Sequence, residues 1–117
     1  MHPNPEPDKK FQRKLNKRVL DLREESGFNS SNEARIEFFF YSHDENNAAN
    51  LSVDLYKLNY EIYGVEKAPG ENEWSIIGIT PFMKLDVDVI TEWTGLMYGI
   101  AGKHSSLFDG WGTMISE

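Results

Sequence analysis

The sequence predicts an α+β domain built on one antiparallel sheet with its two connecting helices on the same face. Apolar residues repeat with the period of a strand in four segments and with that of a helix in three. The first helix-like segment stands alone at the N-terminal end. The other six segments follow in the order β-α-β-β-α-β, which is that of a ferredoxin-like fold. A length of 117 residues is that of a single domain.

The N-terminal part divides into a tail and a helix. Residues 1–8 are rich in proline and asparagine, show no periodicity, and are expected to be a disordered tail before a single domain over residues 9–117. From Lys9 onward one helical face is apolar and the rest is basic; the apolar residues are Phe11, Leu15, Val19 and Leu22. Gly27 is a plausible C-terminal stop. We therefore predict an amphipathic, basic helix over residues 9–27 that packs on the domain.

The β-α-β-β-α-β core is predicted over residues 34–115. Residues 34–42 alternate as a strand, with one side formed by Ile36, Phe38 and Phe40 and the other by Arg35, Glu37, Phe39 and Tyr41. Ser42 and Glu45 fit a capping box, so a helix should follow, and its shared face consists of Ala48, Leu51, Leu55 and Leu58.

The second half of the core, from residue 60 onward, is predicted to contain three strands and one helix. Residues 60–65 and 74–80 are rich in aromatic and β-branched residues and predict two strands, joined by a turn at residues 67–70. Asp86 is the expected N-cap of a helix that ends near Gly102. Its predicted buried stripe is Val89, Trp93, Leu96 and Ile100, and close approach of a neighbouring backbone would explain Gly95 and Gly99. Residues 108–115 form the last strand.

Composition excludes several classes of protein. The chain has no cysteine, so disulfides and thiolate metal sites are excluded, and no apolar run is long enough to span a bilayer. The first residues lack the apolar core of a signal peptide, so we expect a cytoplasmic protein. The formal charge of −7 divides into +4 over residues 1–23 and −11 over the remainder. Such an acidic body favours basic partners and disfavours direct contact with nucleic acid.

Catalytic and metal-binding patterns are missing. The three histidines are scattered and are expected to be exposed polar residues, and Asp86 with Asp88 is explained by helix capping. There is no phosphate-binding glycine loop and no nucleophile elbow. We therefore predict no enzyme, no cofactor and no metal.

Two features point instead to a binding surface. Phe39 lies in the row of the first strand that should face away from the helices, where a one-sided sheet carries polar groups. The segment Phe108-Asp109-Gly110-Trp111-Gly112-Thr113 carries glycine at alternate positions, and periodicity leaves open whether Trp111 is core or surface. First and last strands are neighbours in a ferredoxin-like sheet, so we predict one partner-binding patch made of Glu37, Phe39, Asp109 and Trp111.

That C-terminal segment resembles the Tyr-Asp-Gly-Trp-Gly-Thr ending of the ribonuclease E activity regulator B (RraB-like) family. Arg35-Ile36-Glu37 and the stretch 56–62 are also similar to the family's pattern, and the resemblance covers roughly residues 34–115. It implies a ferredoxin-like domain with an added N-terminal helix. It also implies a non-enzymatic protein that binds ribonuclease E and lowers its cleavage of RNA. The basic N-terminal segment is a departure, because that of the family's well-known members is acidic.

Two other functions fit the residues. An immunity or antitoxin-type module would use its acidic body to neutralise a basic target. An RNA-binding domain would hold phosphates with the basic residues between Lys9 and Arg18. The sequence does not fix the oligomeric state.

Overall fold

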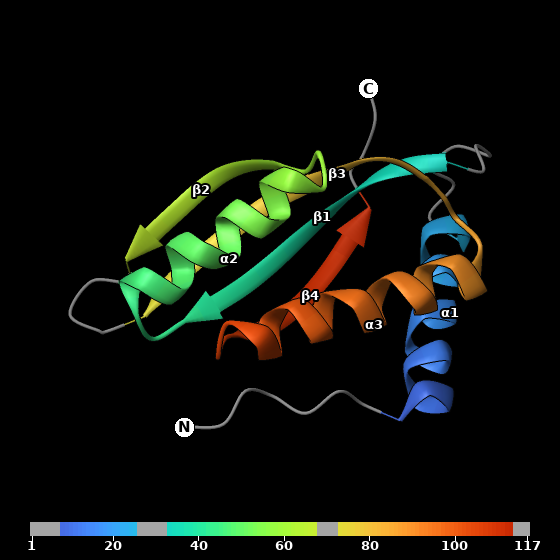
Figure 1. Ribbon diagram of the computed structural model, residues 1–117. Coiled ribbons are helices and arrows are strands. Elements are labelled where there is room, and N and C mark those ends of the chain that lie inside the picture. The colour runs from blue at the N-terminus through green and yellow to red at the C-terminus, as the bar shows by residue number, and fades with distance from the viewer. Residues whose placement is uncertain (1–7, 26–32, 68–72, 114–117) are drawn as a thin grey trace.

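In the part of the chain that the structure describes, a four-stranded antiparallel sheet packs with three helices (Figure 1). The computed structural model describes residues 8–25, 33–67 and 73–113. Its elements in chain order are α1 (Lys9–Glu25), β1 (Glu33–Ser42), α2 (Glu45–Lys57), β2 (Glu61–Lys67), β3 (Trp74–Lys84), α3 (Val87–Lys103) and β4 (Leu107–Thr113). The strands pair antiparallel in the order β2-β3-β1-β4. The predicted α+β class and antiparallel sheet are thus confirmed.

The hydrophobic core lies between the sheet and helices α2 and α3, which cover the same face (Figure 1). The even-numbered side of β1 is buried as predicted, because Ile36, Phe38 and Phe40 have no exposed surface. From α2 the core receives Ala48, Leu51 and Leu55. Leu58, the fourth residue expected there, is the C-cap and is exposed.

Helix α3 confirms two residues of its predicted buried stripe, because Trp93 lies in the core and Ile100 packs against it, and contradicts the other two. Its core residues are Ile90, Trp93, Met97 and Ala101. Val89 and Leu96, which the sequence assigned to the buried stripe, are 40% and 46% exposed. The helix carries apolar residues on more than one face, so two overlapping stripes satisfy the helical period, and packing on the sheet selects one of them.

The two helix caps differ in outcome. Asp86 caps α3 as predicted, accepting hydrogen bonds from the backbone N–H groups of Asp88 and Val89 at 3.0 and 3.1 Å. The predicted capping box of α2 is wrong, because Asp44 is its N-cap and accepts from Asn46 N at 2.7 Å. Ser42 is instead the buried last residue of β1.

Helix α1 docks with a face turned from the predicted one, so that of the four predicted residues Val19 is half-buried and Leu22 is exposed. Gln12 and Asn16 are the buried residues, at 8% and 0% exposure, and they face α3. Phe11 and Leu15, which the sequence assigned to the packing face, are 56% and 43% exposed. The expected tail up to residue 7, the stop at Gly27, the turn at 68–70 and the end of the last strand at 114–115 lie outside the described residues. Among the helices of the described part, none is long and apolar enough to cross a bilayer.

The glycines of β3 and α3 have opposite surroundings. A Cβ on Gly78 would lie 2.5 Å from the carbonyl oxygen of Glu61 and 2.5 Å from Cζ of Phe38, so only glycine fits between these groups. A Cβ on Gly95 or Gly99 would meet nothing within 4 Å. The predicted close approach to the α3 glycines is therefore wrong, and the close approach occurs at Gly78.

Replacing these glycines by alanine should have effects of opposite sign. We expect Gly78→Ala to lower the free energy of unfolding by about 3 kcal/mol, because β2 or Phe38 must move. Gly99→Ala should raise it by about 1 kcal/mol, because alanine is the better helix former and the added methyl group meets open space. Urea denaturation of both variants and the wild type measures the two differences. A Gly78→Ala variant as stable as the wild type would contradict the packing described here.

Candidate functional site

The sheet has one face that no described helix covers. Helices α2 and α3 pack on the other face, and α1 packs on α3 (Figure 1). Residues directly opposite one another in paired strands point to the same side, so the strand register defines this outer face. It consists of Glu33, Arg35, Glu37, Phe39 and Tyr41 of β1, Glu61, Tyr63, Gly64 and Glu66 of β2, Ser75, Ile77, Ile79, Phe82 and Lys84 of β3, and Leu107, Gly110 and Gly112 of β4.

Two side-chain bridges cross β3 on the outer face. The Tyr63 hydroxyl donates to Glu37 Oε2 at 2.6 Å, and Arg35 Nη2 lies 3.1 Å from Glu61 Oε1. Both bridges join β1 to β2 over the strand between them. Ile79 lies opposite both glutamates and is only 3% exposed, although no described helix covers it. The two bridges therefore shield the Ile79 side chain from solvent.

The bridge between Tyr63 and Glu37 keeps its proton on the tyrosine. Burial of the hydroxyl, followed by its hydrogen bond to the Glu37 carboxylate, raises the pKa of Tyr63 to about 12. The phenol is therefore a hydrogen-bond donor throughout the physiological pH range. Glu37 is thus oriented by a fixed neighbour on this face of the sheet.

Exposed aromatic rings flank these bridges. Tyr63 is 53% exposed and Phe82, which lies opposite Arg35, is 68% exposed. Phe39 and Tyr41 are half-buried. An open sheet face normally carries polar groups, so this concentration of rings marks an unusual surface.

Sequence reasoning missed Tyr63 and Phe82. Tyr63 stands at a β-bulge where the β2–β3 register shifts, so period-two counting does not assign its side. Phe82 follows Pro81, and the predicted strand ended at Thr80, whereas β3 continues to Lys84. Proline is expected at strand ends, but here the register shift between Arg35 and Glu37 accommodates it.

Glycines lie on both sides of the pair formed by Phe39 and Ile77 on the outer face. Phe39 and Ile77 pair with each other, and their outer neighbours are Gly110 on β4 and Gly64 on β2. Gly110 has φ of +125°, a conformation that favours glycine over other residues. Because these glycines have no side chain, a partner can approach the backbone of the sheet closely on either side of Phe39 and Ile77.

The bulge at Asp109 corrects the predicted patch. Phe40 pairs with Phe108, but Phe39 pairs with Gly110, so one extra residue, Asp109, reverses the alternation of β4. Trp111 therefore lies opposite Phe38 on the helix side and packs against the core. Glu37 and Phe39 do share the outer face, and Asp109 is exposed at the bulge. The four residues do not form one surface.

Trp111 instead belongs to a polar junction that holds α1. Its Nε1–H donates to Asn16 Oδ1 at 3.1 Å, which also accepts from Gln12 Nε2 at 2.8 Å. The Asn16 amide nitrogen in turn donates to Oγ1 of Thr91 and of Thr94, at 3.1 and 3.3 Å. The indole ring also meets that of Trp93 edge to face. The question that periodicity left open is thus answered: Trp111 is a half-buried structural residue.

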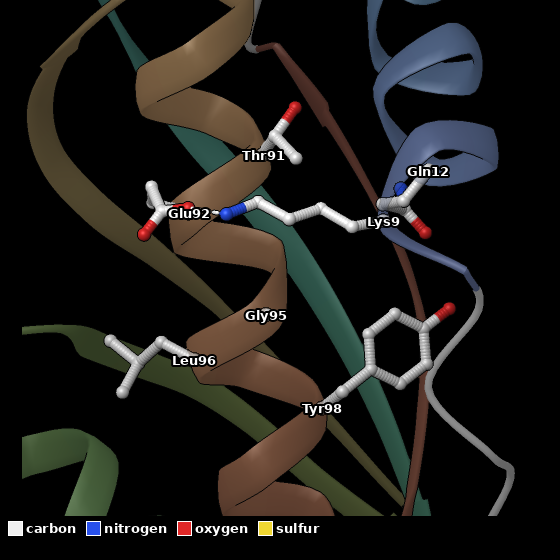
Figure 2. A pocket seen from close by; sticks show the side chains of 7 residues that line it. All are labelled: Lys9, Gln12, Thr91, Glu92, Gly95, Leu96 and Tyr98. Carbon is white, nitrogen blue, oxygen red and sulfur yellow. Dashed lines mark hydrogen bonds and ion pairs between the residues drawn. The ribbon is translucent and has the colours of Figure 1, made fainter.

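A hollow of about 300 Å³ lies beside this junction, where the first turn of α1 meets α3 (Figure 2). The Lys9 side chain reaches across it to form an ion pair with Glu92, and Gly95 forms part of its wall. The side chains of Lys9 and Glu92 are 72% and 70% exposed, so water screens the ion pair. The hollow offers no buried acid–base pair for catalysis.

The histidines of the described residues, His43 and His104, do not form part of a metal site. His43 is exposed as predicted, whereas His104 is half-buried, with Nε2 2.7 Å from Asp54 Oδ2. His104 first, and Lys103 second, hold the pKa of Asp54 below its ordinary value. Within residues 8–25, 33–67 and 73–113, no three histidine, aspartate or glutamate side chains gather closely enough to hold a metal ion.

Comparisons with known proteins agree with one another. The family model described as Regulator of ribonuclease activity B matches residues 13–113. The protein of that name from Pseudoalteromonas atlantica is 29% identical over 105 residues, which cover 88% of this chain and 90% of the relative. The one from Aeromonas hydrophila is 30% identical over 93 residues, covering 78% and 81%. The Haemophilus ducreyi protein is 31% identical over 84 residues, covering 70% and 59%.

Removing the indole donor should loosen α1 without unfolding the sheet. In Trp111→Phe, Asn16 loses one hydrogen bond worth about 1 kcal/mol, so the amides of α1 should exchange with solvent roughly five-fold faster. Amides of β1 and β3 should keep their wild-type rates. Tyr56→Phe, at a residue that is 74% exposed, is the matched control. Hydrogen–deuterium exchange measures both, and unchanged α1 exchange would contradict the role given to Trp111.

Proposed function

This chain belongs to the family of regulators of ribonuclease activity B, and from that premise we propose that it binds a ribonuclease and lowers its activity. The proposed partner is ribonuclease E, in the cytoplasm, and the chain acts by protein–protein contact without catalysing a reaction. A regulator of this kind works stoichiometrically, so inhibition saturates when every enzyme site is occupied.

The observation that carries the proposal is the exposure of aromatic rings on the outer face. Phe82 and Tyr63 are 68% and 53% exposed on the face that also carries half-buried Phe39. Aromatic residues are enriched at the centres of protein interfaces, where they bury much area at little cost in side-chain entropy. Glu37, fixed by Tyr63, supplies an oriented acceptor at the same place. Of the sequence-predicted residues, Glu37 and Phe39 therefore remain the proposed contacts.

Charge favours a basic protein partner over RNA. Residues 24–117 carry a formal charge of −11, which repels phosphates from this part of the chain. On α1, the cations of Lys9, Arg13 and Lys17 are paired with Glu92, Asp88 and Asp21. These ion pairs weaken the alternative in which α1 holds RNA.

We also infer that the domain is ferredoxin-like. Helix α2 connects β1 to β2 with β3 between them, and α3 connects β3 to β4 with β1 between them. This interleaving of two β-α-β units supports the assignment. It leaves one sheet face open, which is the face proposed here for the partner.

Truncating the most exposed ring tests the proposed surface. We expect Phe82→Ala to weaken binding to purified ribonuclease E at least ten-fold, about 1.4 kcal/mol, because a central aromatic contact is lost. Its effect on folding should be small, since the ring is 68% exposed in the free protein. Isothermal titration calorimetry gives the affinity, and an RNA cleavage assay should show the same loss of inhibition.

Leu96→Ala is the matched control, because Leu96 is exposed on α3, away from the outer face. It should bind as the wild type does. Asp109→Ala tests the remaining sequence-predicted contact separately from the outer face. Wild-type affinity in Phe82→Ala, with the fold intact by circular dichroism, would eliminate the outer face as the binding surface.

A further inference from the structure

Helix α1 presents three of its five apolar residues to solvent, whereas Val19 and Leu20 are half-buried. Its buried residues are polar, Gln12 and Asn16, whereas Phe11, Leu15 and Leu22 are 56%, 43% and 45% exposed. Figure 1 shows α1 at the margin of the molecule, beside α3. A helix normally buries its apolar stripe, so the exposed part of these side chains offers apolar surface to another molecule.

The exposed stripe has the spacing of a helix-pairing seam. Phe11, Leu15, Arg18 and Leu22 follow one another at intervals of four, three and four residues, which is the pattern of core positions in a coiled coil. The aliphatic stem of an arginine covers apolar surface while its guanidinium stays in water, so Arg18 is compatible with such a seam. A 17-residue helix is about 25 Å long, enough for two such layers on each side of a centre.

The seam is complementary to itself in the antiparallel direction. When two copies of α1 lie antiparallel about the midpoint between Leu15 and Arg18, Phe11 of one meets Leu22 of the other. Leu15 then meets the stem of Arg18. Lys14, which flanks the seam, comes close to Asp21 of the second copy, so opposite charges meet twice by symmetry. A parallel pair would place Lys14 beside Val19 of the second copy, with no opposite charge to meet it.

We propose that the face of α1 formed by Phe11, Leu15, Arg18 and Leu22 is a dimer interface for a second copy of this chain. The interface is isologous and consists of one helix from each copy, with Lys14 and Asp21 setting its direction. An anionic membrane is the less favoured occupant, because the body behind α1 is strongly acidic and is repelled by such a surface. A single helix pair is smaller than a standard interface, so the dimer has micromolar affinity.

Sedimentation velocity of the full chain tests the interface without any other protein. From about 1 μM to about 200 μM, the range in which small interfaces associate, the sedimentation coefficient should rise from that of a monomer to that of a dimer. Leu15→Glu should abolish the rise, because it places a charge in the seam. Leu96→Glu, at an equally exposed leucine of α3, should leave the rise unchanged.

Exchanging the charges of Lys14 and Asp21 distinguishes the proposed antiparallel pairing from nonspecific hydrophobic association. Lys14→Asp should weaken the dimer about ten-fold, because like charges then meet at both ends of the seam. The double variant Lys14→Asp/Asp21→Lys should restore most of the affinity. Circular dichroism shows whether each variant is folded. A wild type that stays monomeric overturns the proposal, and so does a dimer that survives Leu15→Glu.

Two further readouts identify other occupants of the stripe. A wild type that is monomeric alone but binds vesicles of phosphatidylcholine with about 30% phosphatidylglycerol would assign the stripe to a lipid surface, against our proposal. Because no ribonuclease is present, failure of the dimer leaves the proposed regulation untouched. A Leu15→Glu variant that still binds ribonuclease E would show that the two surfaces are separate.

Discussion

Strand β1 lies between β3 and β4, and the alternation of its side chains is the constraint on which the rest of the structure depends. Ile36, Phe38 and Phe40 are fully buried against the helices, and this burial fixes the register of both neighbouring strands. It also explains Gly78, whose missing side chain leaves room for the Phe38 ring. The same alternation turns Glu37 and Phe39 outward, so core and candidate binding face are two sides of one strand.

Bulges in β4 and β2 then determine what surrounds those outward residues. The one at Asp109 turns Trp111 inward and leaves glycines on the β4 side of the outer face. The one at Tyr63 brings a hydroxyl onto Glu37. Turned inward, Trp111 meets Asn16, so α1 is attached through polar groups. The outer face and the exposed stripe of α1 are therefore both linked to the register of β4.

Sequence reasoning succeeded where a single period applied. The alternation in β1 and the Asp86 cap could be read from residue types alone, and the C-terminal motif led to the family. It failed where a choice depended on tertiary contacts. Half of the α3 stripe was misplaced because apolar residues offer two faces. The docking face of α1 was misplaced because Asn16 gains four hydrogen-bond partners in the folded state. The side of Trp111 stayed open, and its grouping with Glu37 and Phe39 failed, because one inserted residue reverses every side chain after it.

The central claim is that a ribonuclease docks on the outer face of the sheet. Chemical-shift mapping by NMR of the chain titrated with purified ribonuclease E tests it most directly. We expect the largest changes at Glu37, Tyr63 and Phe82, with the exposed surfaces of α2 and α3 little affected. Changes confined to the helices, with the outer face unperturbed at saturation, would contradict the claim.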